Sequence, residues 1–177
     1  MIMKKQELAD SLHAKQISVL LAEDNAPFRR SLKVLIELDG DIEVVGEAKN
    51  GLEAVRLTGS LHPEVIIMDV AMPLLNGLQA TQRIMETSPE TRILILSAHP
   101  DSEYIKQAAI CGASGYLLKQ SSTQVLARAV REVLEGNSFF CAPIAKLLRN
   151  ECQRLFGKGE LLRKRTAQAA ILVRACN

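Results

Sequence analysis

Three acidic residues, Glu23, Asp24 and Asp69, and one lysine, Lys119, directly follow short apolar segments of this 177-residue chain. Each has an ordinary explanation on its own, because acidic residues before a helix interact favourably with its dipole and a lone Asp often caps one. Together they carry three negative charges against one positive charge, and one divalent cation would neutralise the difference. Carboxylate oxygens with no His or Cys among them favour Mg²⁺, which keeps several waters and leaves room for a phosphoryl oxygen.

The same residues suit phosphoryl chemistry. A carboxylate can act as a nucleophile and form an aspartyl phosphate. Phosphoryl transfer requires mainly positioning and charge neutralisation, which Mg²⁺, the Lys119 ammonium and the Ser97 hydroxyl can supply. We predict that Asp69 is the nucleophile, because it ends the most apolar segment, Glu64–Met68, and burial of that segment would fix its position.

The segments that must position these residues alternate in period. Short apolar runs predict five strands, at Ile17–Ala22, Asp41–Glu47, Glu64–Met68, Arg92–Ser97 and Gly115–Leu118. Helical periods predict five helices, at Ala26–Leu38, after the capping residue Asn50, and at Gly77–Thr87, Ser102–Cys111 and Thr123–Glu135. Within the first helix, one face is predicted to carry Phe28, Leu32, Leu35 and Ile36. Gly136 is the expected C-cap of the last helix.

Strict alternation of strands and helices predicts an α/β fold with a doubly wound, parallel, five-stranded sheet. This is the flavodoxin-like (βα)5 arrangement, followed here by a short C-terminal helical tail. Ligands of such sheets bind outside the carboxyl ends of the strands. The acidic residues, Ser97 and Lys119 all follow or end predicted strands, so we expect them to meet at this edge.

Over about residues 17–137 the chain resembles the receiver domain of bacterial response regulators. The resemblance rests on Glu23-Asp24, on the run from Asp69 to Pro73 with Gly77, on Ser97-Ala98, and on Gly115-Tyr-Leu-Leu-Lys119. It implies phosphorylation of Asp69 by a sensor histidine kinase. It also implies Mg²⁺ bound by Asp24 and Asp69, with help from Glu23 and the backbone carbonyl of Ala71.

The resemblance further implies that Ser97 and Lys119 contact the phosphoryl group. Tyr116 matches the aromatic residue that turns inward when Ser97 moves, although simple core packing is an alternative role for it. Receivers of this kind often dimerise, so a phosphorylation-dependent homodimer is expected. A pseudo-receiver that switches without phosphate is disfavoured, because the acidic residues, Ser97 and Lys119 are all present.

Gln120 follows Lys119 where many receivers have proline, and Gln-Ser-Ser after the lysine is most similar to LuxR/NarL-type regulators. We therefore predict an N-terminal extension at residues 1–16, a receiver at 17–137, and a linker helix with a basic tail at 138–177. Residues 142–156 have a helical period that suits the linker helix. Only 36 residues remain from Ala142, too few for the linker helix and a helix-turn-helix with its recognition helix.

Two functional classes follow from this organisation. The first is a stand-alone receiver that switches a protein-interaction surface, and the second is a truncated LuxR/NarL-type DNA-binding regulator. Residues 1–141 hold 14 Lys/Arg and 18 Asp/Glu, whereas residues 142–177 hold 8 and 2. The basic tail supports at most non-specific phosphate contacts, so no specific DNA binding is expected.

Composition narrows the classes further. Hydrophobic residues make up 47% of the chain and charged residues 24%, which is typical of a globular domain. Aromatic residues make up only 3%, which argues against base stacking as a main activity. We see neither an apolar run of the roughly 20 residues that span a bilayer nor a signal peptide. The four cysteines show neither metal-site spacing nor a disulfide framework, which suits a reducing compartment. From these observations together we expect a cytoplasmic protein with no membrane partner.

Overall fold

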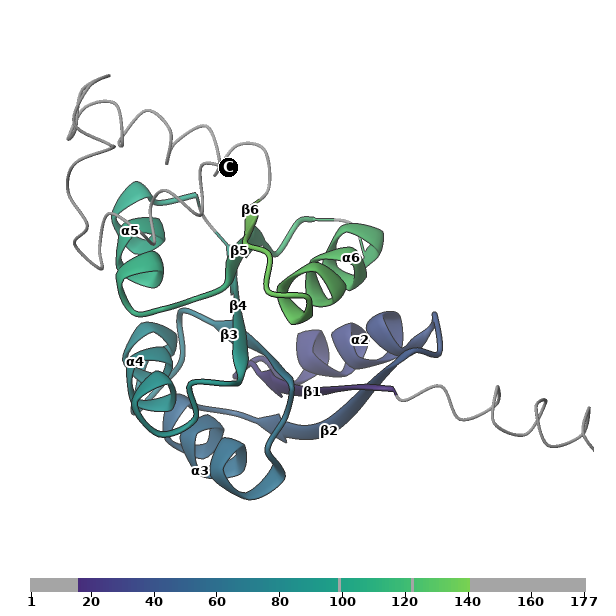
Figure 1. Cartoon of the computed structure of the whole chain (residues 1–177), viewed down its shortest axis with the longest axis horizontal. Coiled ribbons are helices and arrows are strands. Elements are labelled where there is room, and N and C mark those ends of the chain that lie inside the picture. The colour runs from purple at the N-terminus through teal and green to yellow at the C-terminus, as the bar shows by residue number, and fades with distance from the viewer. Residues whose placement is uncertain (1–15, 99, 122, 141–177) are drawn as a thin grey trace, which may run out of the picture.

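A computed structural model describes residues 16–98, 100–121 and 123–140. Its six strands form one parallel sheet in the order β2-β1-β3-β4-β5-β6 (Figure 1). Their bounds are β1 (Ile17–Ala22), β2 (Ile42–Ala48), β3 (Val65–Asp69), β4 (Arg92–Ser97), β5 (Gly115–Leu118) and β6 (Phe139–Phe140). The predicted doubly wound parallel sheet is therefore confirmed, and a short sixth strand is added to the five predicted ones.

Five helices in the described residues cover the two faces of this sheet. They are α2 (Ala26–Glu37), α3 (Gly51–Leu61), α4 (Gly77–Thr87), α5 (Ser102–Ile110) and α6 (Thr123–Leu134). Helices α2 and α6 pack on one face, and α3, α4 and α5 pack on the other (Figure 1). Every helix connects two parallel strands, so the carboxyl ends of β1, β3, β4 and β5 lie at one edge.

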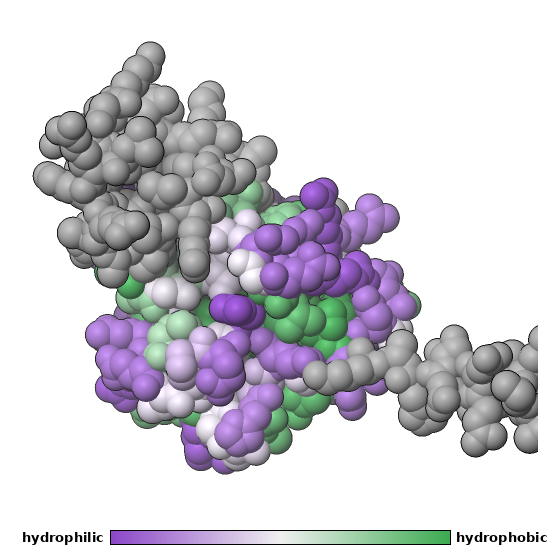
Figure 2. Space-filling view, viewed as in Figure 1, coloured by the Kyte–Doolittle hydropathy of each residue, from purple (hydrophilic) through white to green (hydrophobic). Residues whose placement is uncertain are grey.

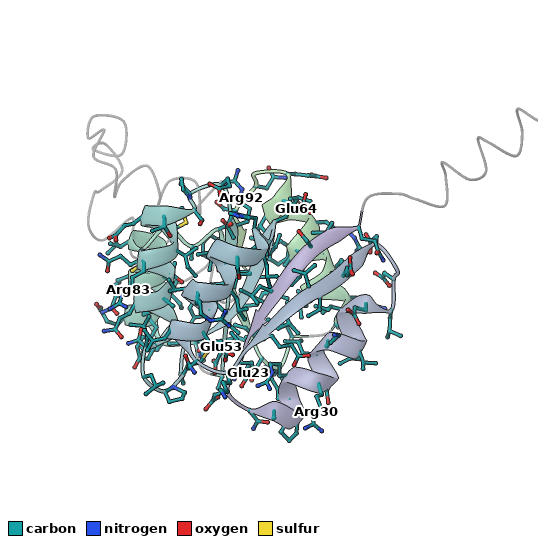
Figure 3. All side chains as sticks on the ribbon, turned by 90° about the horizontal axis from the view of Figure 1, so that it is seen from below. Glu23, Arg30, Glu53, Glu64, Arg83 and Arg92 are labelled. Atoms are coloured by element: carbon teal, nitrogen blue, oxygen red, sulfur yellow. The ribbon has the colours of Figure 1, made fainter. Side chains whose placement is uncertain are left out.

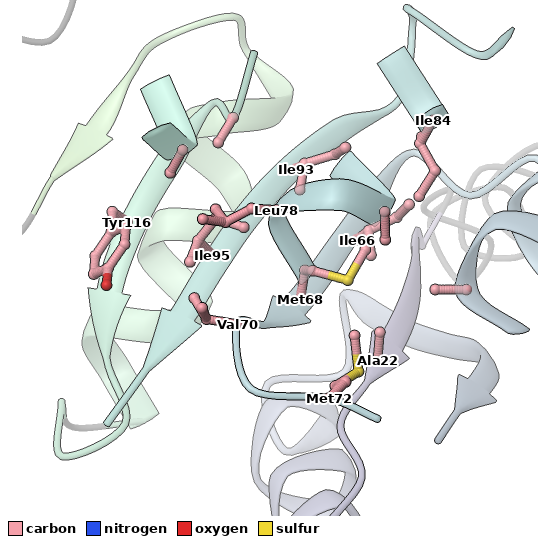
Figure 4. Packing of buried hydrophobic residues seen from close by; sticks show 14 of the residues in the cluster. Ala22, Ile66, Met68, Val70, Met72, Leu78, Ile84, Ile93, Ile95 and Tyr116 are labelled. Atoms are coloured by element: carbon pink, nitrogen blue, oxygen red, sulfur yellow. The ribbon is translucent and has the colours of Figure 1, made fainter. Parts of the chain in front are cut away.

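The central strands are buried because helices cover both of their faces. All five residues of β3 are buried, and alternate residues point into the two cores. In one core, Ile66 and Met68 lie beside Ile93 and Ile95 of the neighbouring strand (Figure 4). Hydrophilic side chains gather over the outer side of α6 (Figure 2). The near-continuous apolar sequence of the central strands is what a parallel sheet between two helical layers requires.

The outer strand β2 pairs with β1 through a register shift. Val19 pairs with Val44, whereas the next residue, Leu20, pairs with Gly46. Val45 is therefore an extra residue on β2, which is an edge strand of the sheet. A bulge of this kind increases the local twist of the strand.

The strand β6 pairs with β5 at two positions, Gly115 with Phe139 and Tyr116 with Phe140. Gly115 makes this approach possible, because a Cβ atom there would lie 2.5 Å from the carbonyl oxygen of Phe139. The two Phe side chains pack against opposite cores. The sheet thus continues past the predicted receiver boundary at Asn137, while the predicted linker helix at residues 142–156 lies outside the described residues.

The Gly115→Ala variant should release β6 from the sheet. We expect the amide of Phe139, which donates to the Ser114 carbonyl oxygen at 3.1 Å, to exchange with solvent about tenfold faster or more. Overpacking at a buried backbone contact typically costs about 1–3 kcal/mol of stability. Hydrogen exchange measured by NMR checks the prediction, and unchanged protection of Phe139 would contradict it.

An ion-pair cluster joins α6 to the turn between α2 and β2. The Arg131 guanidinium donates to both carboxylate oxygens of Asp41, at 2.7 and 2.8 Å, and to Asp39 at 2.7 Å. Hydrogen bonding by Arg131 holds the pKa of Asp41 below its ordinary value, although burial opposes this. Because these side chains are 37% to 57% exposed, water screens the cluster and its contribution is modest.

The Asp41→Asn variant tests this cluster through pH. A depressed folded-state pKa stabilises the fold above the unfolded pKa of about 3.9, and that stabilisation is lost as pH falls through the lower folded value. We therefore expect the variant to be about 0.5–1 kcal/mol less stable than wild type at neutral pH. The difference should shrink at acid pH, as measured by urea unfolding at several pH values. An equal deficit at every pH would contradict the assignment.

None of the helices in the described parts of the chain is long and apolar enough to cross a membrane.

Candidate functional site

Four of the predicted side chains meet at the carboxyl edge of the sheet. Asp69 ends β3 and is 3% exposed, and Glu23 follows β1 and is 2% exposed. Asp24 is exposed beside them, and Lys119 follows β5. Glu23 lies at the opposite end of the sheet from Glu64 and Arg92 (Figure 3). The strand order explains this meeting, because β3 lies between β1 and β4 at the centre of the sheet.

Charge at this edge is unbalanced. Glu23, Asp24 and Asp69 each offer a carboxylate oxygen, and these oxygens all lie within 4.8 Å of one another. Lys119 Nζ lies 2.7 Å from Glu23 Oε2 and 3.0 Å from Asp69 Oδ2. The three carboxylates carry three negative charges against the single positive charge of the ammonium. The excess of two negative charges fits one divalent cation.

One buried oxygen is poorly satisfied. Oε1 of Glu23 accepts from the Asn25 backbone at 3.1 Å, but Oε2 is buried without a well-directed hydrogen-bond donor. The Lys119 ammonium lies 2.7 Å from Oε2 and forms an ion pair with it. Burial raises the pKa of Glu23, the contact with Lys119 lowers it, and the neighbouring Asp69 raises it again. A hard cation would satisfy this oxygen, so the donor set fits Mg²⁺.

Lys119 remains charged in this setting. Burial alone would lower the pKa of its ammonium, but its contacts with Glu23 and Asp69 outweigh burial and raise that pKa. Its backbone amide donates to the Ser97 carbonyl oxygen at 2.7 Å, which ties the end of β5 to the end of β4. The ammonium can therefore neutralise negative charge that develops at Asp69.

The acidic pair is held by the start of α2. Arg29 donates to the backbone carbonyl of Glu23 and, at 2.9 Å, to the carboxylate of Glu47 on β2. The Glu23 amide donates to the Ala48 carbonyl oxygen at 3.0 Å. The Asn25 side chain caps α2 by accepting from the Phe28 amide. This capped turn sets Glu23 and Asp24 at the end of β1.

The loop after Asp69 is fixed by a close backbone approach. The Gly77 amide donates to the Val70 carbonyl oxygen at 3.0 Å, and a Cβ atom on Gly77 would lie 2.0 Å from the Asp69 carbonyl oxygen. Asn76 and Gln79 form a reciprocal capping box at the start of α4. Ala71 is exposed in this loop, two residues past Asp69.

Ser97 ends β4, one position beyond the residue that pairs with Asp69. Tyr116 is fully buried, on the strand beside Ile95 (Figure 4). The structure thus has its ring in the inward position. Both residues lie where the sequence predicts, and their roles stay predictions.

One neighbour of the site was not predicted. The Lys119 ammonium lies 5.1 Å from the centre of the Phe28 ring. The sequence pattern places Phe28 only on the apolar face of its helix, and no feature of the sequence alone pairs it with a lysine 91 positions later.

A buried acidic residue ends a central strand of the parallel sheet, with two further acids and a lysine around it. Comparison with known proteins identifies the family. The response regulator receiver domain family matches residues 19–131. This chain belongs to that family: it contains the receiver domain of a two-component response regulator.

Its relatives are LuxR/NarL-type regulators. The chain is 32% identical to the transcriptional regulatory protein DegU of Brevibacillus brevis over 151 residues, which cover 85% of this chain and 64% of DegU. A LuxR-family response regulator from Aurantimonas sp. SI85-9A1 superimposes with a TM-score of 0.74 at 31% identity, over 77% of this chain and 98% of that one. The receiver domain of the putative response regulator NarL from Mycobacterium tuberculosis superimposes with a TM-score of 0.67 at 32% identity. The match covers 69% of this chain and 98% of that one. The chain spans just under two thirds of DegU's length.

Proposed function

We propose that this receiver accepts a phosphoryl group on Asp69 from a sensor histidine kinase, in a reaction that requires Mg²⁺. The observation that carries the proposal is the buried Asp69 carboxylate, which lies among two further acids and 3.0 Å from the Lys119 ammonium. We assign Mg²⁺ to Asp24, Asp69, Glu23 and the backbone carbonyl of Ala71. A bound Mg²⁺ would neutralise the excess negative charge and polarise the transferring phosphoryl group.

Three residues of the chain have separate roles in the transfer of the phosphoryl group. One carboxylate oxygen of Asp69 attacks the phosphorus, and the bond from phosphorus to the donor's leaving group breaks. The Lys119 ammonium compensates charge on the phosphoryl oxygens, and the Ser97 hydroxyl donates to one of them. The domain does not act on a separate substrate, so we class it as a signalling module that assists only its own phosphorylation and dephosphorylation.

Phosphorylation would then switch a surface. The group adds about −1.5 to −2 charges at Asp69 and draws the Ser97 hydroxyl toward it. Movement of Ser97 would favour the inward position of Tyr116 over an outward one. The shift would change the surface formed by α5 and β5, with a coupling free energy of about 1–3 kcal/mol. That surface would contact a partner or a second copy of the chain, and equal sedimentation with and without phosphodonor would contradict a phosphorylation-dependent homodimer.

Incubation with acetyl phosphate and Mg²⁺ should add the mass of one phosphoryl group to the wild-type protein. The Asp69→Ala variant should gain none, because no other described carboxylate lies at the centre of the site. Intact-protein mass spectrometry with and without EDTA measures both. No gain in wild type, or an equal gain in the variant, would sink the proposal.

A second candidate function is transcriptional regulation, which the name of the relative DegU supports. We place the receiver at residues 17–137 with β6 as its continuation, in a cytoplasmic protein whose basic tail follows. A duplex-binding titration at two salt concentrations separates the candidates. Tight, sequence-selective binding would favour the regulator, and steep salt dependence without selectivity would mean only attraction between the basic tail and phosphates.

A further inference from the structure

We propose that Phe28 is a positioning residue, whose ring holds the Lys119 ammonium at the junction of the carboxylates and so sets both metal affinity and phosphorylation rate. The inference rests on the proposed function and deepens it. The contact by which the Phe28 ring reaches the site is with the Lys119 ammonium, so we infer that it acts through Lys119.

The geometry gives Lys119 three partners. Its ammonium contacts Glu23 and Asp69 at 2.7 and 3.0 Å, and the Phe28 ring centre lies 5.1 Å away. This distance is within the range at which an ammonium is attracted to the face of an aromatic ring. The Lys119 side chain is only 23% exposed, so water competes weakly for the contact.

Phe28 is itself held in place. Its amide donates to the Asn25 side chain at 3.0 Å at the N-terminus of α2, and its ring packs partly buried against the core shared by α2 and α6. The next residue, Arg29, anchors the same turn to Glu23 and Glu47. A ring fixed at this point restricts the places the flexible lysine can occupy.

Restriction of Lys119 has two opposite consequences. A lysine held on Glu23 competes with a cation for that carboxylate, so the ring should weaken Mg²⁺ binding. The same ring keeps the ammonium close to Asp69, where it neutralises the incoming phosphoryl oxygens, so it should speed phosphorylation. A residue that merely supports the fold would be expected to change both properties in the same direction.

The test uses Phe28→Leu, which keeps apolar packing but removes the aromatic face, and Phe28→Tyr, which keeps the face. Calorimetric titration with Mg²⁺ alone should show about two- to fivefold tighter binding by Phe28→Leu, and mass spectrometry with acetyl phosphate at saturating Mg²⁺ should show phosphorylation about two- to fivefold slower. Phe28→Tyr should behave like wild type. Val34→Ala, which removes a side chain 62% exposed on the same helix, is the matched control and should change neither property.

Repeating the Mg²⁺ titration in a Lys119→Met background shows whether Phe28 acts through the lysine. There, Phe28→Leu should leave Mg²⁺ affinity unchanged. A persisting effect, no effect in either background, or parallel loss of affinity and rate would overturn the inference. If the wild-type protein takes up no phosphoryl group, the proposed function fails, but the titrations still decide whether Phe28 positions Lys119.

Discussion

Asp69→Asn should abolish phosphorylation and at the same time make the metal-free protein about 1–2 kcal/mol more stable. The carboxylate is buried within 4.8 Å of two others and has one ammonium to share with them. We therefore expect repulsion and desolvation together to exceed its attraction to Lys119. The variant keeps the shape of the side chain and the contact between Lys119 and Glu23. A gain in stability together with a loss of function is the expected mark of strain at a functional site.

Urea unfolding in EDTA and in Mg²⁺ measures the effect. Wild type should gain stability with Mg²⁺, because the ion binds only the folded state, and the variant should gain much less. Glu43→Gln is a useful control, because it removes an exposed carboxylate of β2 that lies outside the metal cluster. A less stable Asp69→Asn protein in EDTA would mean that the ion pair with Lys119 outweighs the repulsion.

Gly77→Ala should destabilise the fold by about 3–5 kcal/mol and greatly slow phosphorylation. The added Cβ atom would lie 2.0 Å from the Asp69 carbonyl oxygen, and backbone on both sides of the contact must move to relieve the clash. Movement of that carbonyl displaces the end of β3 and with it the Asp69 carboxylate, the proposed phosphoacceptor. The effect therefore reaches the site through the backbone and not through a change of charge.

The matched control is Gly59→Ala, also within a helix. A Cβ atom on Gly59 meets nothing within 4 Å, so the change should stabilise α3 by about 0.5–1 kcal/mol. Thermal unfolding and phosphodonor labelling of both variants check the pair. Similar behaviour of the two proteins would show that the close approach at Gly77 yields easily.

The sequence was most informative where burial dictates the residue type. The bounds of β1, β4, β5 and α4 match the predicted ones. Strands covered on both faces are apolar throughout, and helical periodicity marks α4. The charged cluster was predictable for the same reason, since polar residues that end such strands meet at one edge.

Features that depend on the packing of distant segments were not predictable. Two residues of β6 give no periodicity, and only the close approach at Gly115 accounts for their pairing. The helical pattern placed Leu35 on the apolar face of α2, yet it is 41% exposed. The face of α2 that meets the core carries Leu32 and Ile36, with Phe28 partly buried against the same core. The contact between Phe28 and Lys119 forms only when the folded sheet brings the end of β5 close to the start of α2.

The extra residue in β2 has a consequence for self-association. An outer strand offers backbone groups to which another chain can add, and fibrous aggregates grow in this way. The bulge at Val45 breaks the regular spacing of that edge, and Glu43 and Glu47 add charge beside it. We therefore expect the protein to resist strand-by-strand polymerisation at high concentration, and removal of Val45 to make it form fibres more readily.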